Sequence, residues 1–463
     1  MSIHPPTSFQ GDWVTEIDSD YSTSIARWAA NAVRPAKAVA FVKNARDVAL
    51  VLSYAQEKKL PIAIRGGGNS AAGASSTDGG IVIDLSRHLH SVTVDPAMKL
   101  AYVGGGAVWE TVDKTAIEHG LATVGGTVNH MGVGGLLLGG GQGYLTGQHG
   151  LVLDNLVQAT VVTANGEILT ASDTENPDLF WGIRGAGSNF GVVTEFVLKL
   201  HPQRRTVFGG LVVYHANSLE SLMTTLTKWY KNGLQEREAL FHGFTQCPDG
   251  KPMNILILFW NGSAEEGREH FKEFFDIGPL RDFCQELPYE KMNSLRNGGR
   301  AHQKNYYTKG VFTSGPLSDC AQQMMDYVTE LSQQLEISLT FMFEYLPTKK
   351  VLSVPNGETC HIRGDRVSCV AFATWDADKT PKGDLNSTLT KLVDILATSE
   401  KTLPFASNTG YANYIMEDPA YQPSSGSRVG ANILFARNYP RLQELKRKYD
   451  PNRVFTKWCP INV

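Results

Sequence analysis

Two glycine-rich stretches, Arg65-Gly-Gly-Gly-Asn-Ser70 and Val133-Gly-Gly-Leu-Leu-Leu-Gly-Gly-Gly-Gln-Gly143, carry the clearest chemical signal in the sequence. Each is interpreted as a turn beside an apolar, strand-like run. Because glycine has no Cβ atom, the backbone N–H groups of such turns can approach an anion closely. Together the two stretches predict a binding site for the pyrophosphate of a dinucleotide.

The first stretch also fits a relaxed form of the nicotinamide-dinucleotide fingerprint, with Gly66, Gly68 and Ala71 in the required spacing and Asp84 placed for a ribose contact. That fingerprint must open a helix. Residues 70–80 lack apolar periodicity and contain many residues that weaken helices. NAD binding is therefore the weaker interpretation.

Other kinds of chemistry have little support in the 463 residues. The sequence has no GxSxG elbow and no phosphate-binding P-loop, which argues against serine hydrolases and NTPases. His88 and His90 lack a nearby Asp, Glu or Cys to complete a metal site, so we predict none. With 43 basic and 46 acidic residues, the net charge of −3 argues against a nucleic-acid partner.

The elements that must position the glycine turns are helices and strands in mixed order. Residues 44–60 predict a helix capped by Asn44, with Val48, Val51 and Leu52 in its apolar stripe. We expect a second helix over 108–118, ended by Gly120. Strands are expected at 61–64, 81–85, 91–94 and 100–103. Because βαβ units do not alternate regularly, the predicted fold class is α+β.

A second pattern begins near residue 206, where glycine becomes sparser. Strand-like runs at 208–214, 253–260, 337–345 and 367–375 are separated by helices such as 217–232. For this helix, Asn217 and Glu220 predict a capping box, and its predicted apolar face is Leu219, Leu222, Met223 and Leu226. This pattern predicts an antiparallel sheet backed by helices. We expect a dinucleotide-binding domain over 1–205, a substrate-binding domain over 206–408, and a return to the first domain over 409–463.

The start of the chain lacks a basic stretch followed by a long apolar core, and no apolar run is long enough to span a membrane. The expectation is a cytoplasmic enzyme that does not associate with membranes.

Several motifs in one order resemble the berberine-bridge-enzyme-like FAD-linked oxidases, which have a PCMH-type FAD-binding domain and belong to the vanillyl-alcohol-oxidase fold superfamily. The motifs are Ile64-Arg-Gly-Gly-Gly68, Gly79-Gly-Ile-Val-Ile-Asp-Leu-Ser86, His149-Gly-Leu-Val-Leu-Asp-Asn155, Asp178-Leu-Phe-Trp181 and Asn189-Phe-Gly-Val-Val-Thr-Glu195. The resemblance implies a two-domain flavoprotein that binds FAD. The residues it implies for FAD binding are Arg65, Gly66, Gly67, Gly68, Asn69, Ser70, Gly126, Thr127, Val128, Gly134, Gly135, Gly139, Gly140, Gly141, Gly143, Tyr144, Asp154, Asn155, Gly191, Val192, Val193 and Asn413. For Arg65, an ion pair at the strand end is an equal alternative.

Two positions depart from the family pattern. Asn69 stands where the family usually has a histidine bonded to FAD, and Val128 stands where bicovalent members have a cysteine. Neither side chain can form the usual bond, so we predict noncovalent FAD that is a weaker oxidant than tethered flavin. Met131 stands at the family's oxygen-gate position, where a valine goes with fast reaction with O₂, the expected electron acceptor.

The substrate side of such a site needs a group that accepts the O–H or N–H proton of the substrate. The resemblance places tyrosine and acidic residues from the returning segment there, which singles out Tyr411 and Glu417. Tyr411 and Asn413 are expected on one face of an extended run. His130 lies near the flavin by the same resemblance and is a further candidate.

The predicted function is oxidation of a small, partly apolar organic molecule, such as an alcohol, an amine or a secondary-metabolite intermediate, with hydride transfer to flavin. An alternative is a cyclase or pericyclase in which FAD is mainly structural, because losing both tethers weakens the oxidant without damaging the fold. A third is a catalytically silent binder. Bleaching of the flavin by substrate without oxygen separates the first from the other two.

Overall fold

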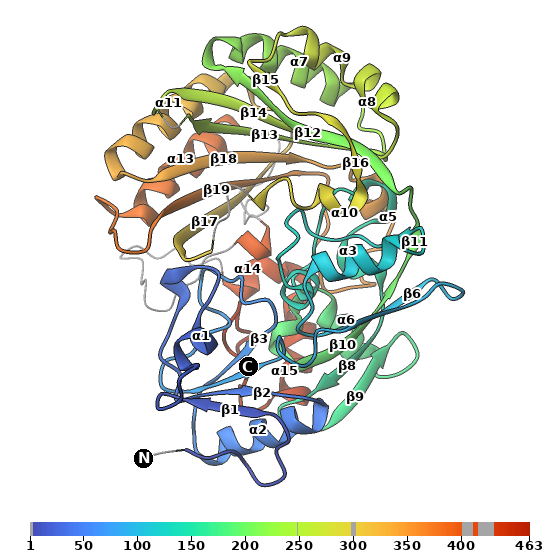
Figure 1. Ribbon diagram of the computed structural model, residues 1–463, viewed down its shortest axis with the longest axis vertical. Helices are drawn as coiled ribbons and strands as arrows, with labels where there is room; N and C mark the ends of the chain where they lie inside the picture. The colour runs from blue at the N-terminus through green and yellow to red at the C-terminus, as the bar shows by residue number, and fades with distance from the viewer. Residues whose placement is uncertain (1–2, 248, 298–301, 401–410, 415–429) are drawn as a thin grey trace.

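The computed structural model describes residues 3–247, 249–297, 302–400, 411–414 and 430–463. Figure 1 shows that both ends of the chain lie in one half of the molecule, and that a large sheet with helices on its outer face forms the other half. The α+β class predicted from the sequence is confirmed. The domain boundaries at 205 and 408 stay a prediction.

A four-stranded sheet carries the first glycine stretch. Its order is β1-β2-β4-β3, with β1 antiparallel to β2 and the remaining pairs parallel. The strands are β1 (Asp12–Thr15), β2 (Ala38–Phe41), β3 (Ile62–Arg65) and β4 (Ile81–Asp84). Helix α2 (Ala45–Glu57) buries its apolar stripe against this sheet, and the Asn44 side chain accepts a hydrogen bond from the Asp47 N–H, as a cap should. Since β3 ends at Arg65, it delivers the chain directly into the glycine turn.

A five-stranded antiparallel sheet supports the second glycine stretch. Its order is β5-β6-β10-β8-β9, and a short pair, β7 (Leu121–Ala122) with β11 (His201–Pro202), lies outside it. The strands are β5 (Val92–Asp95), β6 (Leu100–Gly104), β8 (Leu156–Val162), β9 (Ile168–Ser172) and β10 (Val192–Lys199). The second glycine stretch, interpreted from the sequence as a turn, begins with a short helix, α4 (Val133–Leu138). Its Val133 and Leu137 pack in one core with Phe196 of β10, so tertiary packing decides its structure.

The large sheet is antiparallel throughout, in the order β15-β12-β14-β13-β18-β19-β17, with β16 also paired to β12. Its side chains alternate between two cores: Leu240 and Phe244 of β13 face helices, whereas Phe241 faces the first half of the molecule. Helices α7, α11 and α13 cover the outer face (Figure 1). The strands are β12 (Thr206–His215), β13 (Glu238–Gln246), β14 (Pro252–Trp260), β15 (Arg281–Asp282), β16 (Gln285–Pro288), β17 (Lys304–Thr313), β18 (Ser338–Tyr345) and β19 (Val367–Asp376).

The helices of the first half, in chain order, include α1 (Tyr21–Ile25), α3 (Trp109–Ile117), α5 (Thr146–His149) and α6 (Pro177–Ala186). Those that follow are α7 (Leu219–Lys231), α8 (Ala264–His270), α9 (Lys272–Asp276), α10 (Tyr289–Met292), α11 (Ser318–Leu335), α12 (Lys349–Leu352), α13 (Leu385–Ser399), α14 (Ala431–Phe435) and α15 (Tyr439–Tyr449). Within the described ranges, none is both long and apolar enough to cross a membrane.

The capping box expected at Asn217 and Glu220 is wrong. Residues Ala216–Ser218 form a 3₁₀ turn, and α7 starts at Leu219 after Ser218, without a side-chain cap. The apolar face is as predicted, because Leu219, Leu222, Met223 and Leu226 are buried.

Candidate active site

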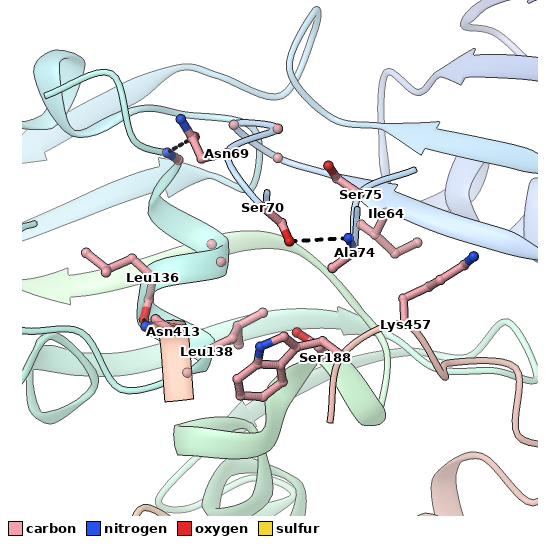
Figure 2. A pocket seen from close by; sticks show the side chains of 18 of the residues that line it. Ile64, Asn69, Ser70, Ala74, Ser75, Leu136, Leu138, Ser188, Asn413 and Lys457 are labelled. Atoms are coloured by element: carbon pink, nitrogen blue, oxygen red, sulfur yellow. Dashed lines mark hydrogen bonds between the residues drawn. The ribbon is translucent and has the colours of Figure 1, made fainter. Parts of the chain in front are cut away.

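A cavity of about 260 Å³ lies where the two glycine stretches, the inner face of the large sheet and the C-terminal segment meet. Figure 2 shows Ser70, Ala74 and Ser75 of the loop after the first stretch at one end, and Leu136 and Asn413 at the other. Residues 454–458 of the C-terminal segment also line the cavity. Three parts of the chain that are distant in sequence therefore form one site.

The two glycine stretches touch each other at the cavity wall. A Cβ atom added to Gly67 would lie 2.5 Å from the Cα atom of Gly132, so only glycine permits this approach. The Asn69 Oδ1 atom accepts a hydrogen bond of 3.0 Å from the Gly132 N–H, drawn in Figure 2. Asn69 therefore joins the two stretches at the position where the resemblance would place a flavin-bonded histidine.

Charged groups stand behind the first glycine stretch. The buried Arg27 guanidinium donates hydrogen bonds to the Ser75 carbonyl at 2.7 and 3.2 Å, which holds the loop that follows Ser70. Arg65 pairs with the fully buried Asp84 at 3.0 Å and does not line the cavity. The ion-pair alternative for Arg65 is thus the one that the structure shows, and its implied contact with FAD is not supported.

The opposite wall presents Tyr414, which lines the cavity and whose hydroxyl donates to Glu344 Oε1 at 2.8 Å. Glu344 is 3% exposed and is also bonded to Arg296, at 3.2 Å, and to Gln142, at 2.7 Å. Arg296 donates to the Thr127 hydroxyl at 2.8 Å as well. A buried carboxylate with three donors is thus linked to the cavity through one tyrosine hydroxyl.

Tyr411 is not placed as the extended run predicted and does not line the cavity, while its role as a proton acceptor stays a prediction. Ala412–Tyr414 form a 3₁₀ turn rather than an extended run, and the Tyr414 N–H bonds the Tyr411 carbonyl at 2.8 Å. The Tyr411 hydroxyl accepts hydrogen bonds from the Gly141 N–H and from Asn413 Nδ2, both at 2.8 Å, away from the cavity lining. Burial raises the pKa of Tyr411, which disfavours it as a base. Tyr411 instead anchors Asn413 and the second glycine stretch.

The cavity brings together most of the residues that sequence reasoning implied. Those that line it are Gly66, Gly67, Gly68, Asn69, Ser70, Val128, His130, Met131, Gly134, Gly135, Gly139, Gly191, Val192, Val193 and Asn413. The His130 ring lies 5.1 Å from that of His302, measured between centroids. Glu417 lies outside the described residues.

Other implied residues support the site without lining it: Gly126, Thr127, Gly140, Gly141, Gly143, Tyr144, Asp154 and Asn155. Their structural contacts explain this. Asp154 pairs with Arg363, Asn155 bonds the His149 and Leu151 carbonyls, and the Tyr144 ring packs on Phe241 and Phe259. For these residues, direct contact with a ligand in the cavity is not supported.

Several cavity or network residues were missed from the sequence: Trp28, Arg296, Glu344, Phe372 and Lys457. They come from separate elements, and no short motif connects them. Alternation along β18 could have identified Glu344 as an inward-facing polar residue, because Phe343 and Tyr345 on either side face the helices.

Comparisons with known proteins agree with this geometry. Residues 36–172 match the family model described as an FAD binding domain, and residues 411–461 match the model described as berberine and berberine like. The chain is 31% identical over 460 residues to FAD-linked oxidoreductase pgmH of Aspergillus terreus, which covers 96% of this chain and 92% of that protein. The chain belongs to the berberine-bridge-enzyme-like FAD-linked oxidoreductases.

Two further comparisons bear on this family. (R)-6-hydroxynicotine oxidase of Paenarthrobacter nicotinovorans is 39% identical over 223 residues, which is 48% of each chain. The crystal structure of 6-hydroxy-D-nicotine oxidase from Arthrobacter nicotinovorans superposes with a TM-score of 0.85 at 25% identity and covers 99% of both chains. As an FAD-linked oxidoreductase, this protein is an enzyme whose cofactor is FAD.

The cavity fits the cofactor of a berberine-bridge-enzyme-like oxidoreductase. The backbone of Gly66–Ser70 borders the cavity, and three of these residues are glycines, which have no side chain. A Cβ atom added to Gly135 would meet no atom within 4 Å. Gly67, Gly68, Asn69 and Ser70 would hold the pyrophosphate, whereas Gly134, Gly135 and Asn413 would lie against the isoalloxazine. In the described parts of the chain, no cluster of three His, Cys, Asp or Glu side chains is arranged to hold a metal ion.

Proposed function

We propose that this enzyme binds FAD without a covalent bond and oxidises a small, largely apolar organic molecule that carries an O–H or N–H group beside the broken C–H bond. The bound FAD supplies the hydride acceptor. The observation that carries the proposal is that one cavity has the glycine stretches on one wall and Tyr414, which is bonded to the buried Glu344, on the other. Cofactor and proton acceptor would thus face the same space.

Two side chains support noncovalent binding. The Asn69 amide is bonded to the Gly132 N–H, and Val128 is apolar and 1% exposed. Neither has a nucleophilic atom to offer to the flavin ring. Acid precipitation should therefore release all the yellow cofactor, and the intact chain should have the mass of its sequence alone. A precipitate that stays yellow would contradict this part of the proposal.

Tyr414 and Glu344 provide a path for the substrate proton. The substrate O–H or N–H would donate its proton to the Tyr414 oxygen, while the tyrosine's own proton passes to Glu344 Oε1, 2.8 Å away. The Arg296 guanidinium, 3.2 Å from that oxygen, stabilises the carboxylate before the transfer. Tyr414 contacts the substrate in this arrangement, and Glu344 acts through it.

The rest of the substrate end favours an apolar molecule. Trp28 and Phe372 line the cavity, and the Trp28 ring is stacked on Tyr306 with centroids 3.8 Å apart. These rings offer flat apolar faces, with Thr308 and His130 as the nearby polar groups. A secondary amine or an aromatic alcohol matches such a wall better than a sugar does.

The test compares Tyr414→Phe with Tyr411→Phe, two tyrosines of one turn of which only Tyr414 lines the cavity. A panel of secondary amines and benzylic alcohols, beginning with (R)-6-hydroxynicotine, is mixed with the wild type under anaerobic conditions until one bleaches the flavin. Tyr414→Phe should then slow bleaching by about 10²–10⁴-fold, the usual contribution of a general base. Tyr411→Phe should slow it far less. Equal rates in both variants, or no bleaching by any compound while a polyene is cyclised, would overturn the proposal.

A further inference from the structure

Positive charge lies behind the loop end of the cavity, outside its lining. Arg65 pairs with the buried Asp84, whereas Arg27 donates its hydrogen bonds to the Ser24, Ala26 and Ser75 carbonyls. Burial lowers the pKa of Arg27 to about 10, the charge of Arg65 adds to that effect, and the charge of Asp84 opposes it. Arg27 therefore remains charged at neutral pH.

Lys457 brings a third cation to the same end. It lines the cavity together with Ile64, Ala74 and Ser75, and Figure 2 draws these residues on the right of the view and Leu136 and Asn413 on the left. Within the described residues, no hydrogen bond or ion pair engages its ammonium group. Burial and the charge of Arg34 lower its pKa, and the charge of Asp78 opposes them.

The backbone before Lys457 is held firmly in place. The fully buried Lys446 ammonium donates to Asp450 at 2.6 Å, to the Phe455 carbonyl at 2.7 Å and to the Asn189 carbonyl at 2.9 Å. Asp450 in turn accepts from the N–H groups of Val454 and Phe455. The segment that carries Lys457 is therefore fixed against the cavity rather than left to vary in position.

We propose that Lys457 binds the diphosphate of FAD from the side opposite the glycine turn, and that this cation supplies affinity that a covalent bond supplies in tethered flavoproteins. The inference rests on the proposed function, because a covalently held flavin would not need it. The diphosphate is the part of FAD that carries negative charge, and Lys457 is a cation that lines this end of the cavity, with the buried Arg27 behind the loop. The glycine motif accounts only for backbone contacts to the diphosphate, and Lys457 adds a side-chain contact.

The test measures dissociation constants for FAD, ADP and adenosine on apo-protein, in the wild type and in Lys457→Met, which keeps the length of the side chain but removes its charge. Lys457→Met should weaken FAD and ADP by about 10- to 100-fold, the worth of one hydrogen bond to a charged group, and should leave adenosine unchanged. Lys457→Arg should restore most of the affinity. Lys448→Met is the control, because it removes the same charge from an exposed pair with Asp178.

The outcomes separate the two proposals. Unchanged FAD and ADP affinity in Lys457→Met, or an equal loss for adenosine, would overturn the role of Lys457 and leave noncovalent binding intact. Wild-type flavin that survives acid precipitation would overturn both. If Lys457→Met does not fold, as judged by circular dichroism, the same comparison uses Lys457→Gln, with Lys457→Arg again expected to bind FAD.

Discussion

Asn69 is, at the scale of one residue, the position on which the proposed noncovalent binding of FAD depends. Its amide accepts a hydrogen bond from the Gly132 N–H at the junction of the two glycine stretches. Asn69→His should form a covalent flavin adduct, because it puts an imidazole at the position that is tethered in relatives with a histidine there. Mass spectrometry of the intact chain would show the added FAD. Asn69→Ala is the control, since it loses the bond to Gly132 without gaining a nucleophile; a folded Asn69→His protein without adduct would mean that the turn aims residue 69 away from the flavin.

Met131 lies at the cavity wall one residue before Gly132, and it packs against the main core. Its long, flexible side chain would fill space that O₂ must cross. Met131→Val should therefore speed the reaction of dithionite-reduced protein with O₂, at a packing cost of about 1 kcal/mol. Stopped-flow mixing with oxygen measures this without a known substrate. Equal rates in the two proteins would show that Met131 is not the gate.

Local signals and distant contacts explain which site residues the sequence could predict. Local sequence was enough to predict the glycine stretches, Asn69 and Met131, because the signal for each lies within a few neighbouring positions. An extended run would place Tyr411 and Asn413 on one face, whereas the 3₁₀ turn brings Tyr414 to the cavity and leaves Tyr411 outside its lining. The network around Glu344 joins residues from positions 127 to 414, which no local pattern connects.

At the scale of elements, α3 fixes the loop that carries His130 and Met131. The first N–H groups of this helix need acceptors, and the loop supplies them: Trp109 N–H bonds the Met131 carbonyl at 3.0 Å, and Glu110 N–H bonds the Asn129 carbonyl at 2.8 Å. On the far side, the Asn293 carbonyl accepts from the Asn129 N–H, and Asn293 Nδ2 donates to the buried Asp113 of α3 at 2.6 Å. Helix and loop therefore form one unit.

Asp113 makes the stability of this unit depend on pH. The pKa of its carboxyl is raised to about 7: burial is the largest cause, the hydrogen bond from Asn293 opposes it, and the charges of Glu290 and Glu110 add to the rise. An acid with a raised folded pKa binds more protons folded than unfolded, so the free energy of unfolding should fall as pH rises from about 4 to about 7. The loss is of the order of a few kcal/mol.

Asp113→Asn should remove this dependence, because an amide keeps the shape and does not titrate. Thermal unfolding at pH 5 and at pH 8 measures the effect: the wild type should lose more stability between these values than the variant. Asp326→Asn, at a hydrogen-bonded exposed site on α11, serves as the control and should behave like the wild type. Parallel pH profiles for wild type and Asp113→Asn would contradict the assignment.

The helical and strand periods of the sequence predict which elements form more accurately than they predict where each element begins and ends. The apolar stripes of α2 and α7 are buried as expected, since burial of one face is what a 3.6-residue period encodes. The predicted cap of α7 is misplaced because a 3₁₀ turn precedes the helix. Helix α4 was not predicted within the second glycine stretch, because its six residues are too few to show a helical period. In both places, tertiary contacts decide the local structure.

At the scale of the whole molecule, the cavity lies between parts that are otherwise separate. Its lining comes from the loop after β3, from α4, from the inner face of the large sheet and from the segment after α15. A ligand that fills such a cavity contacts all of them at once. Binding of FAD should therefore stabilise the molecule as a unit rather than one domain alone.

This coupling gives a prediction that also tests how the cofactor is held. With noncovalent FAD, the melting temperature should rise steadily with added FAD, because a ligand that binds only the folded state adds RT ln(1 + [L]/Kd), about 2.7 kcal/mol at one hundred times Kd. Differential scanning calorimetry of apo-protein over a series of FAD concentrations measures the rise. In Lys457→Met, the melting temperature should rise with the same slope but at higher FAD concentrations, because the variant has a larger Kd and the same coupling between FAD binding and folding. If the melting temperature of apo-protein does not change when FAD is added, binding of FAD in this cavity does not stabilise the fold.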